Sequence, residues 1–186
     1  AIIAGVIGRI DPKKCQHVLI DAAGLLHKKG IPLHLLIIGD KSLNEEAGYE
    51  EQVYRQVEQL GLGEFVHFRP YMSDIEHGYA AMDIFTLTSK SETYGMVTIE
   101  AMASQLPVVG TNDGGTTDII DDGANGLLVE PLDPSALADA IGRLIADPEL
   151  ARRLAEQARR DAFANYSHHR QCELLEEIFD SFDLSD

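Results

Sequence analysis

Short apolar runs alternate with longer amphipathic stretches along this chain, and this alternation constrains the fold more than any other feature of the sequence. We predict strands at 2–7, 33–38, 65–68, 83–88, 106–110 and 126–129. We predict helices at 14–29, 47–60, 74–81, 96–104, 115–121, 135–146, 148–164 and 168–182. Apolar strands that are separated by helices form parallel sheets covered on both faces. The predicted fold class is therefore α/β, with a doubly wound, Rossmann-like parallel sheet in one domain over residues 1–186.

Length, composition and charge exclude several classes of protein. The chain has 186 residues, of which 45% are hydrophobic and 25% charged, and this is typical of one globular domain with a substantial core. No apolar run approaches the roughly twenty residues of a membrane-spanning helix. A net charge of −16 argues against nucleic acid and anionic membranes as partners. Two cysteines are too few to hold the fold by disulfides, so we expect reduced thiols in a cytoplasmic protein.

Two glutamates, Glu92 and Glu100, bracket a glycine at the point where a predicted strand gives way to a helix. The start of a helix presents unpaired N–H groups and the positive end of the helix dipole, and phosphates commonly bind there. Gly95 has no side chain to keep a diphosphate away. Glu100 lies roughly 7 Å along the helix and leans back toward its start, so it could accept from ribose hydroxyls. Glu92 would meet a sugar on the other side of the diphosphate, although both residues could also be ordinary surface glutamates.

A cationic turn follows the first predicted strand of this acidic chain. Residues 1–30 carry five Lys or Arg side chains against two carboxylates. Arg9 and Lys14 lie at the carboxyl end of that strand, where ligands of open α/β sheets bind. Arg can hold phosphate oxygens with two donors, and Lys adds a point charge. We expect both cations to contact a phosphate, while a solvated helix entrance would show the same pattern.

A third segment, 111–118, carries the paired glycines Gly114 and Gly115 after the predicted strand 106–110. Adjacent glycines let a backbone approach a ligand closely, so we expect this loop to border the same site. A turn that only caps the following short helix is the alternative.

Taken in order, these three segments resemble the donor-nucleotide half of the retaining GT-B glycosyltransferases, most closely family 4, the glycosyl transferases group 1. The family's Glu-x7-Glu element corresponds to Glu92–Glu100, including Tyr94 and Gly95. Its Gly-Arg turn with a downstream Lys-Gly corresponds to Gly8-Arg9 and Lys14-Cys15, where the glycine is replaced. Further matches lie at Gly39-Asp40, at Phe68 and at 125–129, and Arg69-Pro70-Tyr71 stands in the loop that binds the base.

The resemblance implies a chain that binds a nucleotide-diphosphate sugar, most commonly a UDP-hexose. Within a complete enzyme, the hexosyl group would pass to an acceptor with retention of the anomeric configuration. The implied catalytic residues are Arg9, Lys14 and Glu92. The implied donor-binding residues are Gly8, Gly39, Tyr71, Thr93, Tyr94, Gly95, Met96, Val97 and Glu100. Because the two cations and the helix start can stabilise the leaving phosphate, and no Asp-x-Asp grouping is present, we expect no metal and no other cofactor.

The chain opens on Ala inside its first predicted strand, which suggests a piece of a longer polypeptide. The resemblance implies a missing N-terminal domain that carries the acceptor site, on which the last helix would pack, so the isolated chain is expected to be inactive. Two alternatives stay open: an isolated nucleotide-binding module without turnover, and a GT-B-fold epimerase or phosphorylase. A nicotinamide-dependent enzyme fits worst, since Gly5-x-x-Gly8-Arg9 departs from the G-x-G-x-x-G turn.

Overall fold

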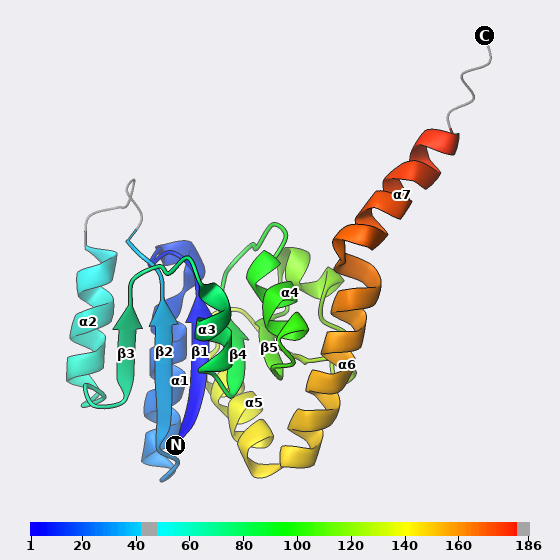
Figure 1. The fold of residues 1–186 in the computed structure, drawn as a ribbon. Helices are drawn as coiled ribbons and strands as arrows, with labels where there is room; N and C mark the ends of the chain where they lie inside the picture. The colour runs from blue at the N-terminus through cyan, green and yellow to red at the C-terminus, as the bar shows by residue number, and fades with distance from the viewer. Residues whose placement is uncertain (42–47, 182–186) are drawn as a thin grey trace.

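The computed structural model describes residues 1–41 and 48–181, which form a parallel sheet with helices on both faces (Figure 1). The strands are β1 (Ile2–Ile7), β2 (Leu33–Ile38), β3 (Val66–Arg69), β4 (Ile84–Leu87), β5 (Val108–Thr111) and β6 (Leu127–Val129). Their order across the sheet is β3-β2-β1-β4-β5-β6, and each neighbouring pair is parallel. The predicted α/β class and all six predicted strands are confirmed.

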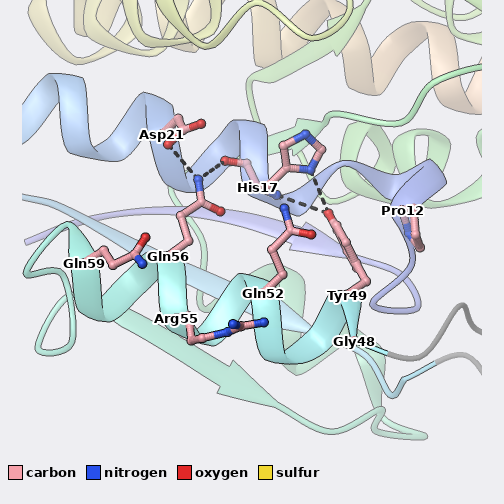
Figure 2. Close-up of a pocket in the computed structure, with 9 residues that line it drawn as sticks. All are labelled: Pro12, His17, Asp21, Gly48, Tyr49, Gln52, Arg55, Gln56 and Gln59. Atoms are coloured by element: carbon pink, nitrogen blue, oxygen red, sulfur yellow. Dashed lines mark hydrogen bonds between the residues drawn. The ribbon is translucent and has the colours of Figure 1, made fainter.

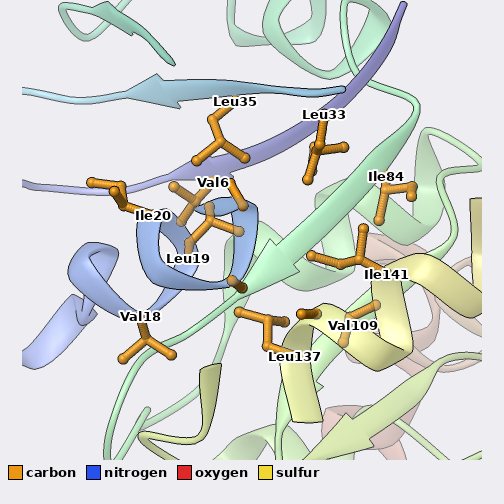
Figure 3. Close-up of a cluster of buried hydrophobic side chains, with 14 of the residues drawn as sticks. Val6, Val18, Leu19, Ile20, Leu33, Leu35, Ile84, Val109, Leu137 and Ile141 are labelled. Carbon is orange, nitrogen blue, oxygen red and sulfur yellow. The ribbon is translucent and has the colours of Figure 1, made fainter. Parts of the chain in front are cut away.

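Two apolar layers hold the helices against the sheet. One face carries α1 (Gln16–Lys28), α2 (Tyr49–Gln59) and α5 (Pro134–Ala146), and the other carries α3 (Ile75–Ala80), α4 (Met96–Ala103) and the later part of α6 (Pro148–Tyr166). In the first layer Leu19 of α1 and Ile141 of α5 are fully buried against strand residues such as Leu35 (Figure 3). Burial of apolar surface on both faces explains why the strands are apolar throughout.

Three Asp-Pro pairs mark where helices begin. The Asp133 carboxylate accepts from the N–H groups of Ser135 and Ala136, both at 2.9 Å, and Pro134 occupies the first turn of α5. Asp147 caps α6 in the same way, and Asp11 precedes the 3-10 turn η1 (Pro12–Lys14). Asp supplies an acceptor for an unpaired N–H, and Pro lacks an N–H that the first turn could not use. The helix predicted at 135–146 is confirmed, and it begins one residue earlier, at Pro134.

Two predicted helices differ in detail. The predicted helix 14–29 begins only at Gln16, because Cys15 has a left-handed backbone conformation (φ 51°, ψ 39°). The predicted helix 115–121 is a short 3-10 helix, η2 (Gly114–Asp118). Paired glycines are weak helix formers, and 3-10 turns are used in such short pieces. Residues 41–49 are mostly polar, and the sequence predicts a surface loop there, but residues 42–47 lie outside the described residues.

The last helix, α7 (His168–Ser181), continues from the end of α6 and leads away from the sheet (Figure 1). Its Leu175 and Phe179 side chains are exposed, by 54% and 68% of their surface. In the described part of the chain, no helix combines the length and the apolar character needed to span a membrane.

Candidate functional site

The strand order reverses between β1 and β4, and the site is built on the loops that leave these two strands. β1 leads to α1 on one face and β4 leads to α4 on the other, and ligands of such sheets bind outside the carboxyl ends at this point. The two loops are tied together. The Lys90 N–H donates to the Lys13 carbonyl at 2.8 Å, and the Thr88 hydroxyl donates to the Lys14 carbonyl at 2.7 Å.

Lys14 and Glu92, predicted from separate motifs, meet at this point. Lys14 Nζ lies 2.7 Å from Glu92 Oε2, and the two side chains are only 25% and 14% exposed. Burial would raise the pKa of Glu92, but the hydrogen bond and the charge of Lys14 outweigh it and hold the pKa below its ordinary value of 4.5. The Ser89 hydroxyl also favours the charged form, although its geometry falls short of a hydrogen bond. Glu92 is therefore ionised at neutral pH and leaves Lys14 partly neutralised.

Arg9, the third predicted catalytic residue, is exposed just beyond β1. Its carbonyl accepts from Gln16 Nε2 at 2.8 Å, which fixes the backbone of the turn. Its guanidinium makes no hydrogen bond or ion pair with any residue in 1–41 or 48–181. This cation is thus available to a ligand, whereas Lys14 has a carboxylate partner.

The start of α4 has the geometry predicted from Gly95. That residue has a left-handed backbone (φ 73°, ψ 36°), and its carbonyl accepts from the N–H groups of Thr98 and Ile99. Among the described residues, no acceptor meets the N–H groups of Gly95, Met96 and Val97. Unpaired donors and the helix dipole together favour an anion. Tyr94 and Met96 flank this position and are 52% and 53% exposed.

Glu100 lies on the second turn of α4 and is half-buried. One of its oxygens accepts a 2.6 Å hydrogen bond from the hydroxyl of Tyr79, a residue of α3 that is 2% exposed. Burial, followed by the neighbouring carboxylate, raises the pKa of Tyr79, so that the phenol stays protonated. No sequence motif links Tyr79 to Glu100, 21 positions further along the chain, so Tyr79 was not among the predicted site residues.

The paired glycines after β5 approach the loop that carries Glu92. The Gly115 N–H donates to the Glu92 carbonyl at 2.7 Å. A Cβ atom at Gly114 would lie 2.4 Å from the Glu92 carbonyl oxygen, and one at Gly115 would lie 2.5 Å from that of Thr93. Asp113 adds a further contact by accepting from the Ser91 N–H at 2.7 Å. The close approach that we expected for a ligand is therefore made by the protein's own backbone.

Cys15 occupies the position where the resembled pattern has glycine, and it keeps the left-handed conformation of a glycine. This conformation costs a non-glycine residue roughly 1–2 kcal/mol. The thiol is buried and lies 3.1 Å from the Pro12 carbonyl, and burial raises its pKa. The turn that carries Lys14 thus keeps its shape without the glycine.

The remaining predicted donor residues lie along the same edge of the sheet. Gly8 and Gly39 leave the neighbouring strands β1 and β2, and their N–H groups already donate to the carbonyls of Ile38 and Arg69, both at 2.9 Å. They can offer space to a ligand, but not N–H donors. Tyr71 lies beyond β3 and is 64% exposed, so it is separate from the Lys14–Glu92 pair.

A hollow of about 820 Å³ lies elsewhere, between α1 and α2 (Figure 2). Its polar groups are mostly paired with one another. Tyr49 Oη lies 2.9 Å from His17 Nδ1, and Gln56 Nε2 donates to the His17 carbonyl and to Asp21. None of the predicted site residues lines this hollow. Within the described residues, no group of three or more His, Cys, Asp or Glu side chains is arranged to hold a metal ion.

Comparisons with known proteins identify the family. The family model of the Glycosyl transferases group 1 matches residues 1–161. A D-inositol 3-phosphate glycosyltransferase of Corynebacterium urealyticum is 35% identical over 97% of this chain and 43% of its own length. The putative glycosyltransferase EpsD of Bacillus subtilis is 34% identical over 93% of this chain and 44% of its own length. The chain belongs to the Glycosyl transferases group 1 family, and it spans less than half the length of these relatives.

Solved structures agree with this assignment. Anabaena Alr3699/HepE in complex with UDP-glucose matches with a TM-score of 0.89 and 29% identity, over 97% of this chain and 49% of that one. The C-terminal domain of LpcC, a glycosyl transferase group 1 family protein of Francisella tularensis, matches with a TM-score of 0.82 and 29% identity, over 90% of this chain and 87% of that one. The structural neighbours are GT-B glycosyltransferases, so the predicted GT-B-type, Rossmann-like fold is confirmed.

Proposed function

We propose that this group 1 domain binds a nucleotide-diphosphate sugar, with a UDP-hexose as the donor. In the complete enzyme, a retaining member of family 4, the hexosyl group passes to an acceptor without a metal ion. One observation carries the proposal: the Lys14–Glu92 pair lies at the β1–β4 reversal, among motifs that also include the unpaired N–H groups of α4. The UDP-glucose complex of Alr3699/HepE, a neighbour of the same fold, supports the class of donor.

The proposed mechanism follows from the charges that develop during transfer. Breaking the bond between the anomeric carbon and the diphosphate places negative charge on the leaving phosphate. Arg9, Lys14 and the N–H groups of Gly95 and Met96 stabilise that charge, which lowers the barrier. Glu92, held in place by Lys14, accepts hydrogen bonds from hydroxyls of the donor sugar. The acceptor attacks on the face from which the diphosphate departs, which gives retention.

The nucleotide is bound on the other side of the diphosphate. Glu100 accepts from the ribose hydroxyls, and Tyr71, beyond β3, packs against the base. The exposed side chains of Tyr94 and Met96 border the diphosphate. Thr93 and Val97 contribute through the backbone on either side of the turn at Gly95.

The acceptor site belongs, in this proposal, to an N-terminal domain of a cytoplasmic enzyme, and the exposed Leu175 and Phe179 of α7 pack on that domain. The chain covers only 43% of the D-inositol 3-phosphate glycosyltransferase of Corynebacterium urealyticum, which leaves room for a second domain. Catalysis depends on bringing the two substrates into register, and this can lower a barrier by roughly 7–11 kcal/mol. The isolated chain should therefore bind the donor and transfer almost nothing.

Calorimetry with UDP, GDP, ADP and UDP-glucose, each in the presence of EDTA, tests donor binding directly. We expect UDP and UDP-glucose to bind, and Lys14→Met to weaken both by about tenfold or more through loss of a charge-assisted contact. Lys29→Met is the matched control, because Lys29, at the carboxyl end of α1, forms an exposed 2.7 Å pair between its Nζ and Asp139 of α5. Loss of UDP affinity in the presence of EDTA would refute metal independence. Equal losses of affinity in Lys14→Met and Lys29→Met would show that the phosphates do not bind at Lys14.

A binding module without turnover is the second candidate, because the Lys14–Glu92 pair and the unpaired N–H groups of α4 could bind a diphosphate without any transfer. A retaining transfer by the full-length protein, with the product anomer identified by NMR, would reject it. Binding without transfer in the full-length protein would support it.

A further inference from the structure

Tyr79 provides a buried hydrogen-bond donor beneath the proposed nucleotide site. Its ring is 2% exposed and packs near Phe85, at 5.9 Å between centroids, in the core on the α3–α4 side of the sheet. Its hydroxyl lies 2.6 Å from Glu100 Oε2 and 3.1 Å from the Val97 carbonyl oxygen. Neither group can donate, so the single phenol proton has two acceptors to choose between.

The shorter distance identifies the preferred acceptor. A hydrogen bond from a hydroxyl to a carboxylate is typically 2.5–2.7 Å long and stronger than one to a neutral carbonyl. The pKa of Tyr79 is raised by burial and by Glu100, so the phenol stays protonated at neutral pH and acts as the donor in this contact.

The contact restricts the conformation of the Glu100 side chain but leaves most of its hydrogen-bond acceptor positions free. An ionised carboxylate has about four positions for hydrogen bonds, and Tyr79 occupies one of them. A long side chain on the second turn of a helix would otherwise sample several rotamers. Tyr79 is anchored by core packing, so it transmits the rigidity of the core to a half-buried carboxylate.

We propose that Tyr79 is a positioning residue that holds Glu100 in the orientation that accepts from the ribose hydroxyls, and so sets the preference for ribonucleotides over 2′-deoxyribonucleotides. The inference rests on the proposed function, because it requires Glu100 to face the ribose. It adds a residue outside every motif of the sequence. A purely structural Tyr79 would affect folding and all ligands alike, whereas a positioning residue changes the discrimination between ligands.

The test compares the dissociation constants of UDP and 2′-deoxy-UDP by calorimetry. We expect the unmodified chain to prefer UDP by about tenfold, the size of one lost charge-assisted hydrogen bond. Tyr79→Phe removes only the hydroxyl and should reduce the preference to about threefold or less, mainly through weaker UDP binding. Tyr54→Phe is the matched control and should leave the preference unchanged, because the hydroxyl of the exposed Tyr54 donates to Glu50 at 3.2 Å within α2.

Two further variants distinguish an error in the role of Tyr79 from an error in the assignment of Glu100 to the ribose. If Glu100→Gln removes the preference and Tyr79→Phe does not, the role of Tyr79 is wrong and the assignment of Glu100 stands. If neither variant alters the preference, the assignment of Glu100 to the ribose is wrong and the inference falls with it. Should Tyr79→Phe fail to fold, 3-fluorotyrosine at position 79 keeps the ring and makes the hydroxyl a stronger donor. We expect it to raise the preference for UDP, and an unchanged preference would overturn the inference.

Discussion

The ion pair between Lys14 and Glu92 decides whether replacing Glu92 with Gln should strengthen or weaken the binding of UDP. Lys14 and Glu92 are partners at 2.7 Å, so a diphosphate that uses Lys14 must share it with a carboxylate. Gln keeps the shape and the hydrogen-bonding capacity of Glu92 but removes its charge. The nucleoside diphosphate should then meet a more positive site, while the donor sugar loses an ionised acceptor.

The magnitude follows from the geometry. Two unit charges at the observed 2.7 Å attract by about 1.5 kcal/mol at the dielectric constant of water and by about 6 kcal/mol at an effective value of 20. Desolvation of the two half-buried groups offsets much of this attraction. We therefore take the net stabilisation by the ion pair as about 1–2 kcal/mol, between the values of fully exposed and fully buried pairs. Glu92→Gln should therefore leave UDP binding unchanged or tighten it by up to about thirtyfold, the equivalent of 2 kcal/mol.

The assay is calorimetry with UDP and UDP-glucose on the same preparations. Glu92→Gln should weaken UDP-glucose relative to UDP by about tenfold, since a hydrogen bond to a charged acceptor is replaced by a neutral one. Asp139→Asn is the control, because it breaks the exposed pair with Lys29 and should alter neither ligand. Equal weakening of UDP and UDP-glucose by Glu92→Gln would refute both the competition for Lys14 and the assignment of Glu92 to the sugar.

Arg9→Ala should weaken UDP by about tenfold or more while leaving the thermal midpoint unchanged, since the guanidinium makes no hydrogen bond or ion pair with a described residue. An unchanged affinity would place the phosphate away from β1. Gly115→Ala should lower the free energy of unfolding by about 2–4 kcal/mol in urea titrations, because its Cβ would lie 2.5 Å from the Thr93 carbonyl oxygen. Gly63→Ala is the control and should be tolerated, because a Cβ there meets nothing within 4 Å. Equal effects of the two variants would contradict the steric argument. Because the pKa of Glu92 is lowered in the folded protein, its ionised carboxylate stabilises the fold at pH values above the ordinary pKa of 4.5, and this stabilisation is lost as the pH falls through the folded pKa. In urea titrations at several pH values, the free energy of unfolding of Glu92→Gln should therefore fall less steeply with acid than that of the unmodified chain. An equally steep fall would contradict the prediction.

The backbone framework of the site was predictable from the sequence because it depends on local patterns. Apolar strands, Asp-Pro helix starts and the glycine at the beginning of α4 each act over a few residues. The order of parallel strands then brings the turn at Lys14 and the loop at Glu92 to one edge. This is why two motifs 78 positions apart could be assigned to one site before their 2.7 Å contact was known.

Contacts between side chains of different elements could not be predicted in the same way. Tyr79 reads as an ordinary apolar residue of α3, and nothing in its surroundings indicates that its hydroxyl reaches Glu100. The same limit affects Gly114 and Gly115, whose pairing indicates a close approach but not its partner. The packing of α3 on α4, and of η2 on the loop at Glu92, decides both contacts, and sequence periodicity carries no information on such packing.

The loops of the site are held together mainly through backbone atoms, and this separates stability from binding within the same few residues. The loops after β1, β4 and β5 are tied by hydrogen bonds from the Lys90 N–H to the Lys13 carbonyl and from the Gly115 N–H to the Glu92 carbonyl. Neither bond uses a side chain of the candidate site. Only small residues permit such approaches, so substitutions of the glycines should destabilise the fold. Within residues 1–41 and 48–181, by contrast, the Arg9 side chain makes no hydrogen bond or ion pair and the Lys14 side chain makes one ion pair, so their replacement should change affinity at a small cost in stability. A site built in this way can keep its framework while its side chains are replaced, so replacing the exposed Tyr71, which we propose to pack against the base, should change ligand preference at a small cost in stability.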